Sequence, residues 1–302
     1  MLKLYPALLL VITLLSGLGG AIIKKIYSKY STNTTRGALF FNAIVSGVCM
    51  IAIFIINGFD TKISTFTIIF GIIFGLVTLL QQITNILALK VGPLSYTQVI
   101  LSLATIIPTF YGVIVNGDEL NAFKIVGIIL MVACFILSVN FSSTEKKGNI
   151  LWLILSLIAC ICTGIIGILQ MEHQNSTHKQ ELNMFLVIAF LVSTIFSVAI
   201  FFIIPNKRKE PLFIEKVKQK NNLLLYIILI LFVFSGIFAG FNNVINLHLS
   251  GVMSSVILFP ILNGGGLILI VLSSFIFFKE KLNLKQWIGI SCGIASVIFL
   301  CF

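Results

Sequence analysis

The sequence predicts an all-α integral membrane protein with ten transmembrane helices, arranged as two inverted five-helix repeats. Three observations support this fold class. The 302 residues are 59% hydrophobic and only 10% charged, whereas soluble domains carry about 25% charged residues. The apolar residues form continuous runs of about 20 residues, the length that a helix needs to cross a bilayer. One short polar motif occurs twice, 161 positions apart.

Short polar breaks divide the chain into ten apolar runs. Their length and the lack of period-2 alternation indicate helices rather than barrel strands. The first run could also be read as a secretory signal. Because only Lys3 precedes this run whereas Lys24 and Lys25 follow it, we expect a retained helix. The expected helices cover residues 4–23, 37–56, 66–89, 95–115, 123–141, 150–170, 184–204, 223–246, 252–278 and 284–302.

The net charge of +11 comes from 20 basic and nine acidic residues. A basic chain can bind nucleic acid, but here the basic residues lie in the expected loops and report orientation instead. If the ten helices alternate, sixteen basic residues fall on one side and four on the other. The positive-inside rule makes the richer side cytoplasmic, so we expect a cell-membrane protein with both termini outside. The expected partners are the lipid bilayer and a small-molecule substrate, with no nucleic acid.

The repeated motif is a pentapeptide rich in carboxamides. Its first copy, Gln81 to Asn85, reads QQITN, and its second copy, Asn242 to Asn246, reads NNVIN. Each copy begins six residues after a glycine and lies inside a long apolar run. Carboxamides are costly to hold in hydrocarbon unless they are paired or face water. Both halves of the chain therefore place polar groups at an equivalent depth.

The duplication extends to other positions. Ser16-Gly17 near the start of the chain matches Thr163-Gly164, and Leu120-Asn121 matches Leu282-Asn283. We therefore expect one five-helix repeat over residues 1–145 and another over residues 146–302. Five is an odd number, so the second repeat enters the membrane upside down relative to the first. Inverted repeats of this kind place binding sites near the membrane midplane and can exchange conformations to give alternating access.

The amides have two possible roles, which the sequence leaves open. On a helix, Gln81 and Asn85 share a face, as do Asn242 and Asn246. Such faces could contact substrate in a cavity, or they could hold helices together, at about 0.6 to 2 kcal/mol for each interaction. Recurrence cannot decide, because a duplicated gene inherits scaffold and site alike. The candidate substrate-binding residues are Gln81, Gln82, Asn85, Tyr96, Gln98, Asn242, Asn243, Asn246 and Asn263.

Other features suggest structure more than chemistry. Gly264 to Gly266 removes three side chains in succession, which favours close helix approach over a local break. Pro108 and Pro260 are expected to kink their helices. Glu172 and His173 follow the expected end of the sixth helix, which favours a solvated loop over a pH sensor or a metal site at the outer mouth.

A family resemblance is carried by several short motifs. The segments 103–108 and 117–121 with Gly127 resemble the second part of the EamA-type domain of the drug/metabolite transporter superfamily, and 277–283 does so as well. The segment 263–266, with the two expected helices around it, looks like the last two helices of small multidrug resistance transporters, which belong to the same superfamily. The resemblance implies a ten-helix secondary transporter with two five-helix halves around a central cavity.

The chain departs from the proton-coupled multidrug branch at one position. That branch has a membrane glutamate in its first helix, and aligning the lysine that ends that helix with Lys24 or Lys25 places Ser16 or Gly17 there. All nine acidic residues of this chain lie in expected loops or at helix ends. Because proton antiport usually needs an acid inside the membrane, the sequence favours facilitated diffusion, exchange or another coupling.

We therefore expect an exporter or facilitator of a small neutral or zwitterionic polar metabolite, such as an amino acid, that works by alternating access. No cofactor or metal is expected, and the protein is expected to be a monomer or homodimer. A proton-coupled multidrug efflux pump with Glu172 as its coupling acid is the alternative, and a channel explains inverted duplication less economically. A membrane-embedded enzyme is disfavoured, since the sequence offers no intramembrane acid pair, no His/Cys metal constellation and no nucleophile with a base at workable spacing.

Overall fold

The fold is known from a computed structural model. It describes residues 5–30, 35–91, 97, 100–138, 150–204, 222–269, 272 and 283–302, and at 20–30, 35, 38, 89–90, 222–225 and 227–228 it describes the backbone alone. Within these ranges the secondary structure is helical, with no β-strand. The basic loops on which the orientation of the termini depends, such as residues 205–221, lie largely outside the described residues.

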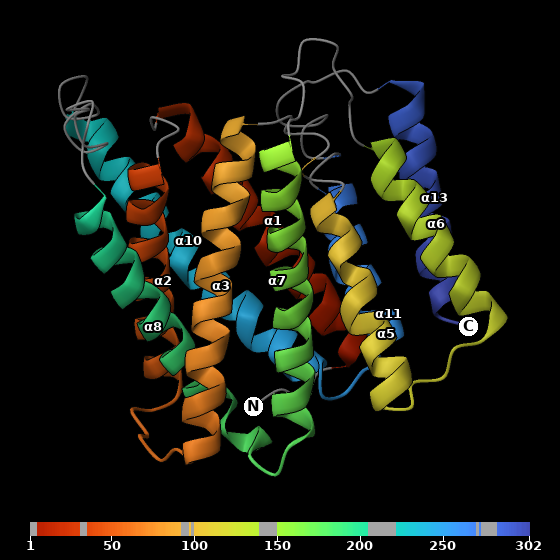
Figure 1. The fold of residues 1–302 in the computed structure, drawn as a ribbon, viewed down its shortest axis with the longest axis horizontal. Helices are drawn as coiled ribbons and strands as arrows, with labels where there is room; N and C mark the ends of the chain where they lie inside the picture. Colours follow the sequence, from red (N-terminus) through yellow and green to blue (C-terminus); the bar gives the residue numbers. More distant parts are fainter. Residues whose placement is uncertain are drawn as a thin grey trace. The chain divides into compact units, whose positions relative to one another are not determined.

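Each of the ten expected spans overlaps a described helix (Figure 1). The first five are represented by α1 (Pro6–Tyr30), α2 (Thr35–Ile56), α3 (Thr65–Val91), α5 (Ile106–Val115) preceded by the 3-10 turn η1 (Leu103–Thr105), and α6 (Ala122–Ser138). The second five are represented by α7 (Ile150–Asn175), α8 (Leu182–Ile203) preceded by η2 (Lys179–Glu181), α10 (Asn222–Leu249), α11 (Ser255–Pro260) continued by η3 (Ile261–Gly265), and α13 (Leu284–Leu300).

Helices α2, α3, α7, α8 and α10 are long and apolar enough to cross a membrane. The surface of these helices carries large apolar side chains: Ile154 of α7 and Ile195 of α8 are exposed, and Phe202 is 76% exposed. Small hydroxyl residues such as Ser197 are buried instead. Soluble proteins rarely expose so much apolar surface to water. Apolar side chains outside and small polar side chains inside are typical of a membrane protein.

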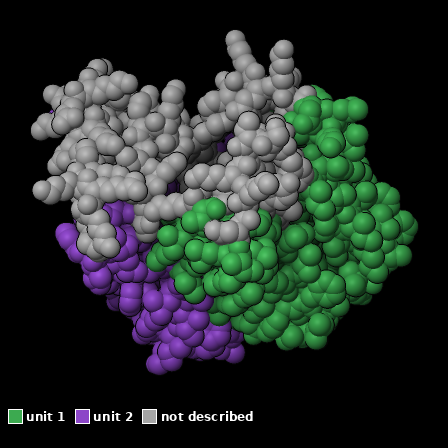
Figure 2. Space-filling model, turned by 45° about the horizontal axis from the view of Figure 1, so that its top comes forward, with its two compact units in different colours: residues 1–14, 80–175, 247–302 green, residues 15–79, 176–246 purple. Residues whose placement is uncertain are grey.

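The chain forms two compact units (Figure 2). Unit 1 comprises residues 1–14, 80–175 and 247–302, and unit 2 comprises residues 15–79 and 176–246. Each unit therefore contains helices from both halves of the sequence. The two repeats expected from the sequence, residues 1–145 and 146–302, are a different division of the chain from these two units. The repeats remain a prediction.

In unit 2, α2 packs along α8, and glycines seat the two motif-bearing helices on this pair. A Cβ atom added to Gly75 of α3 would lie 2.5 Å from the Ala189 carbonyl oxygen of α8. A Cβ atom on Gly236 of α10 would lie 2.6 Å from the Cβ of Val48 in α2. The equivalent glycines that precede the two amide motifs therefore both allow close helix approach, the usual role of small residues between membrane helices.

In unit 1, α6 packs along α13, and α5 packs against α7 and α11. The α5–α7 contact again depends on glycine, because a Cβ atom on Gly164 would lie 2.5 Å from Ile107. The expected asparagines begin the paired helices α6 and α13: Asn121 Oδ1 accepts from the Lys124 N–H at 2.9 Å, and Asn283 Oδ1 accepts from the Gln286 N–H at 2.9 Å. This is a helix N-cap in both cases, at the two asparagines that the sequence matched between its halves.

The glycine run Gly264 to Gly266, in the ninth expected span, combines close helix approach with a local irregularity, which the sequence analysis treated as alternatives. A Cβ atom on Gly264 would clash with the Met131 sulfur of α6, so this residue permits close approach, whereas nothing lies within 4 Å of one on Gly266. The same run ends a π-helical segment that begins directly after Pro260. Proline cannot supply a helix hydrogen bond, and a π-helical turn is one way to absorb that loss. The segment is therefore both tightly packed and locally irregular.

Candidate functional site

The second amide motif belongs to a chain of hydrogen bonds in unit 2. Asn242 Nδ2 donates to Ser16 Oγ of α1 at 3.2 Å. Asn246 Nδ2, one turn further along α10, donates to Asn242 Oδ1 at 2.8 Å. Gly17 leaves room for this arrangement, because a Cβ atom there would lie 3.2 Å from Asn242 Nδ2. Ser16, at the position that the resemblance aligned with a membrane glutamate, is thus an acceptor for an amide.

This chain of hydrogen bonds has a direction. Each amide uses its N–H group toward Ser16, so the chain ends in an oxygen, Asn246 Oδ1. That oxygen is buried and accepts no hydrogen bond in the structure. The third amide, Asn243, donates to the Ala239 carbonyl of its own helix at 2.8 Å. Thus the N–H groups of the motif are engaged locally, and at least one carbonyl is left over.

The first motif lies in unit 1 and differs in its contacts. Gln81, Gln82 and Asn85 are half-buried, and their side chains form no hydrogen bond with the described residues. Thr84, which is buried, donates to the Leu80 carbonyl at 2.8 Å within α3. Asn85 Oδ1 is buried without a partner, as is the oxygen of Asn246 at the equivalent position of the second motif.

The remaining candidates are less well defined. Asn263, in η3, donates to Thr105 Oγ1 at 2.6 Å and to the Phe259 carbonyl at 3.1 Å. This side chain connects the irregular segment to η1 within unit 1. Tyr96 and Gln98 lie outside the described residues. Asn42 of α2 donates to Ser197 Oγ of α8 at 2.8 Å, which is the interhelical role that the sequence weighed for lone amides.

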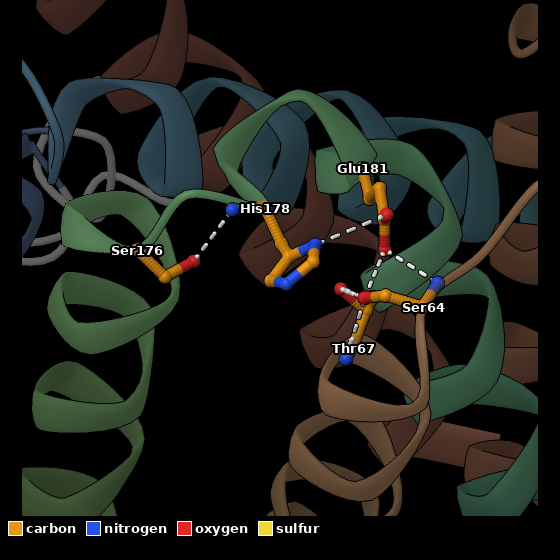
Figure 3. A network of polar contacts seen from close by, with 5 residues as sticks. All are labelled: Ser64, Thr67, Ser176, His178 and Glu181. Atoms are coloured by element: carbon orange, nitrogen blue, oxygen red, sulfur yellow. Dashed lines mark hydrogen bonds and ion pairs between the residues drawn. The ribbon is translucent and has the colours of Figure 1, made fainter.

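Two carboxylates at helix ends are used to hold helix N-termini. Asp118 Oδ2 accepts the Ser255 N–H of α11 at 2.7 Å and also the Ser255 hydroxyl. Glu181 Oε2 accepts the Ser64 N–H at 2.9 Å and the Ser64 hydroxyl at 2.7 Å, directly before α3 (Figure 3). A negative charge is favourable at these positions, because the first N–H groups of a helix lack partners and its dipole is positive there.

The Glu181 carboxylate is held in its charged form. Burial alone would raise its pKa. Hydrogen bonds from Thr67, Ser64 and His178 outweigh burial and lower the pKa from 4.5 to about 2. The His178 Nδ1 atom lies 3.4 Å from Glu181 Oε1 in the same turn. Glu181 thus acts as a fixed anion for helix capping, which makes it a poor candidate for carrying a proton during transport.

Sequence reasoning was wrong about the end of the sixth helix. It expected Glu172 and His173 in a solvated loop, but α7 continues to Asn175 and His173 is fully buried. Gln174, also buried, is 3.2 Å from His173 Nδ1, and the Tyr111 side chain of α5 hydrogen-bonds Glu172. The spacing of Gln170, His173 and Gln174 over one helical turn was the signal that could have revealed this buried polar face.

The described residues contain no group of three or more His, Cys, Asp or Glu side chains arranged to hold a metal ion. The six cysteines are free, and none forms a disulfide.

Comparisons with known proteins describe the fold but not the activity. No family model matches the sequence, and no curated protein matches it. Among solved structures, a chain described only as "Crystal structure of protein" is similar, with a TM-score of 0.73 and 11% sequence identity. The similarity covers 97% of this chain and 98% of that chain. At this identity it establishes that the fold is shared over the full length, and nothing about function.

Proposed function

We propose that this protein is a secondary transporter of the cell membrane, an exporter or facilitator of a small neutral or zwitterionic polar metabolite such as an amino acid. The observation that carries the proposal is the duplicated amide motif, held on α3 and α10 by glycines at equivalent positions. Burying amide side chains in an apolar membrane helix costs free energy, and polar residues kept there usually mark a functional site. In this proposal, amides from both repeats take part in binding the substrate.

Alternating access follows from the same duplication. The matched residues Gly75 and Gly236 make matched helix contacts, and so do the N-caps Asn121 and Asn283. This supports two copies of one five-helix design, inverted in the membrane, whose two conformations exchange. The EamA-type resemblance agrees with such an arrangement. The proposal also includes that both termini face the outside of the cell and that the protein is a monomer or a homodimer.

The described anions support a neutral or zwitterionic substrate. Asp118 and Glu181 are occupied with helix N-termini, and the hydrogen bonds of Asn242 and Asn246 described above go to Ser16 and to each other rather than to a carboxylate. An isolated cation would then have no charge partner among these groups, which is unfavourable in a region of low dielectric. A solute whose own charges cancel avoids this cost.

Metabolite profiling of cells that overproduce the protein tests the function. We expect one or a few polar metabolites to accumulate outside the cells with the wild-type protein. Gln81→Ala and Asn242→Ala should abolish this accumulation while the variants remain folded in the membrane. Asn183→Ala, which affects a half-buried amide bonded to Asn57 outside the two motifs, serves as the matched control. Unchanged flux in both motif variants would reject the assignment of the amides.

A proton-coupled efflux pump remains the second candidate because of the Tyr111–Glu172 pair and the buried His173 beside it. In that case a pH gradient across proteoliposomes would drive uptake of a lipophilic cation. Glu172→Gln would abolish this uptake, because a proton could no longer bind and leave there. If the protein is instead an exporter or facilitator of a polar metabolite, the Glu172→Gln variant should transport that metabolite at a normal rate, and the rate should not depend on the pH gradient.

A further inference from the structure

An arginine connects the start of α2 to the end of α8, two helices that pack along each other within unit 2 (Figure 1). Arg36 of α2 donates from Nη1 to the Ile204 carbonyl oxygen, directly after α8, at 3.2 Å. Its guanidinium also lies 4.5 Å from the centre of the Phe201 ring. A cation is favourable at a helix C-terminus, because the last carbonyl groups lack partners and the dipole is negative there. The contact with α8 therefore positions the Arg36 side chain.

The surroundings of Arg36 are apolar and face outward. The Phe201 ring centre lies 6.2 Å from that of Phe40 in α2 and 5.4 Å from that of Phe202. Phe202 and Ile203 are each 76% exposed. In a membrane protein, large apolar side chains with this exposure contact lipid. The half-buried Arg36 thus lies at a helix end beside a surface that contacts lipid.

The charge of Arg36 has no counter-ion among the described residues. The structure gives this side chain two contacts there, a backbone carbonyl and an aromatic ring, and neither carries a full negative charge. A guanidinium has five N–H groups, so most of them remain after one hydrogen bond to a carbonyl. Its planar shape matches two oxygen atoms of a phosphate or carboxylate group. Arg36 is therefore suited to hold an anion at the edge of the membrane.

The charge of this end of the chain indicates which anion is available. In the sequence, the segment 205–221 directly after Ile204 has six basic and two acidic residues. We expect this side of the membrane to be cytoplasmic, and the cytoplasmic leaflet is rich in anionic lipids that attract basic segments. A phospholipid also supplies acyl chains, which suit the exposed Phe202 and Ile203 side chains. A soluble anion offers no such apolar part.

We propose that Arg36 binds the phosphate of an anionic phospholipid, whose acyl chains lie along the exposed apolar side chains at the end of α8. The lipid stabilises the pairing of α2 with α8 at this end, because a ligand that binds only the folded protein raises its stability. This inference concerns a lipid site and does not depend on the proposed transport function.

Equilibrium titration in mixed micelles tests the lipid preference with the purified full-length protein. The probes are dioleoyl-phosphatidylglycerol and dioleoyl-phosphatidylcholine, which share acyl chains and phosphate but differ in net charge. We expect the wild-type protein to bind the glycerol lipid about fivefold more tightly, the effect of one basic residue near an anionic surface. Salt at about 1 M should weaken this preference, because it screens charges beyond about 3 Å. Equal affinity for the two lipids would overturn the inference, and this arm needs no variant.

Variants then assign the preference to Arg36. Arg36→Gln should lose about fivefold in affinity for phosphatidylglycerol and little for phosphatidylcholine. Arg36→Lys keeps the charge but not the planar group, so its affinity should lie between those of wild type and Arg36→Gln. Lys285→Gln is the matched control, since it removes one positive charge from an exposed side chain of α13 expected on the same side of the membrane. An unchanged affinity in Arg36→Gln, or an equal loss in Lys285→Gln, would overturn the assignment.

A competition experiment distinguishes a lipid from a soluble anion. Glycerophosphoglycerol, the headgroup of phosphatidylglycerol without its acyl chains, is added at increasing concentration to the complex of protein and lipid. We expect no displacement when it equals the lipid in concentration, because the acyl chains contribute to binding. Displacement at that concentration would show that Arg36 belongs to a site for a soluble phosphate, and the lipid inference would be rejected.

Discussion

The two amide motifs share an origin in the sequence but differ in what their side chains do. In the second motif, Asn242, Asn243 and Asn246 all donate hydrogen bonds, and one of these reaches Ser16 in another helix. In the first motif, Gln81 and Asn85 form none with the described residues. The difference teaches that two copies of one motif can diverge in their contacts. In the second copy an amide links α10 to α1, whereas the amides of the first copy form no hydrogen bond with the described residues.

The largest effect is expected where the two motifs are alike, at the glycines that seat their helices. Gly75→Val and Gly236→Val should each destabilise the protein by about 3 kcal/mol, since overpacked side chains force neighbouring helices apart. Gly75 faces a backbone carbonyl and Gly236 faces a valine side chain, so the loss should be greater at Gly75. Thermal unfolding in detergent measures both, with Gly266→Ala, where nothing lies within 4 Å, as the control. A small effect at either glycine would mean that the two helices are not seated in the same way.

The next effect separates the motifs. Asn242→Ala should destabilise the protein by about 1 to 2 kcal/mol, because it removes one donor and one acceptor and leaves Asn246 without its partner. Gln81→Ala should change stability by less than about 0.5 kcal/mol, as expected of a side chain without hydrogen bonds. Unfolding midpoints in the same detergent give the comparison. Equal losses would show that both motifs hold helices together.

Stability should change in the opposite sign at Asn85. Replacing it with leucine removes a buried oxygen that has no partner, and this relieves a desolvation cost of about 1 kcal/mol. Asn85→Leu is therefore expected to raise the unfolding midpoint while it weakens substrate binding, a trade-off that is common where a site is kept ready for a ligand. A variant that is both less stable and fully active would show that the Asn85 oxygen has a structural partner.

The sequence was sufficient to predict the positions of the helices, but it was insufficient to predict which side chains contact one another. Hydropathy predicted where the helices lie, since each of the ten expected spans overlaps a described helix. Among the described residues, five helices are long and apolar enough to cross a membrane. The glycines and asparagines that the sequence matched between its halves make matched contacts in the structure, at Gly75 and Gly236 and at Asn121 and Asn283. The sequence singled out Ser16 as a repeated position but could not pair it with Asn242, because the two residues lie 226 positions apart.

Two local features also escaped prediction. The π-helical turn after Pro260 depends on how a lost hydrogen bond is absorbed, and hydropathy does not report this. The extension of α7 to Asn175 buries His173 because neighbouring residues pack against it, and a polar segment read alone looks like a loop.

The smallest effect tests the direct link between Ser16 and Asn242. Ser16→Ala removes one acceptor from a hydrogen bond of 3.2 Å, and interhelical hydrogen bonds in membranes contribute about 0.6 kcal/mol on average. A double-mutant cycle with Asn242→Ala should therefore give a coupling energy of about that size. The same cycle with Asn243→Ala should give a coupling near zero, because Asn243 donates to Ala239 in its own helix. Equal couplings would mean that Asn242 has no special link to α1, and the interhelical role of the second motif would then have to be abandoned.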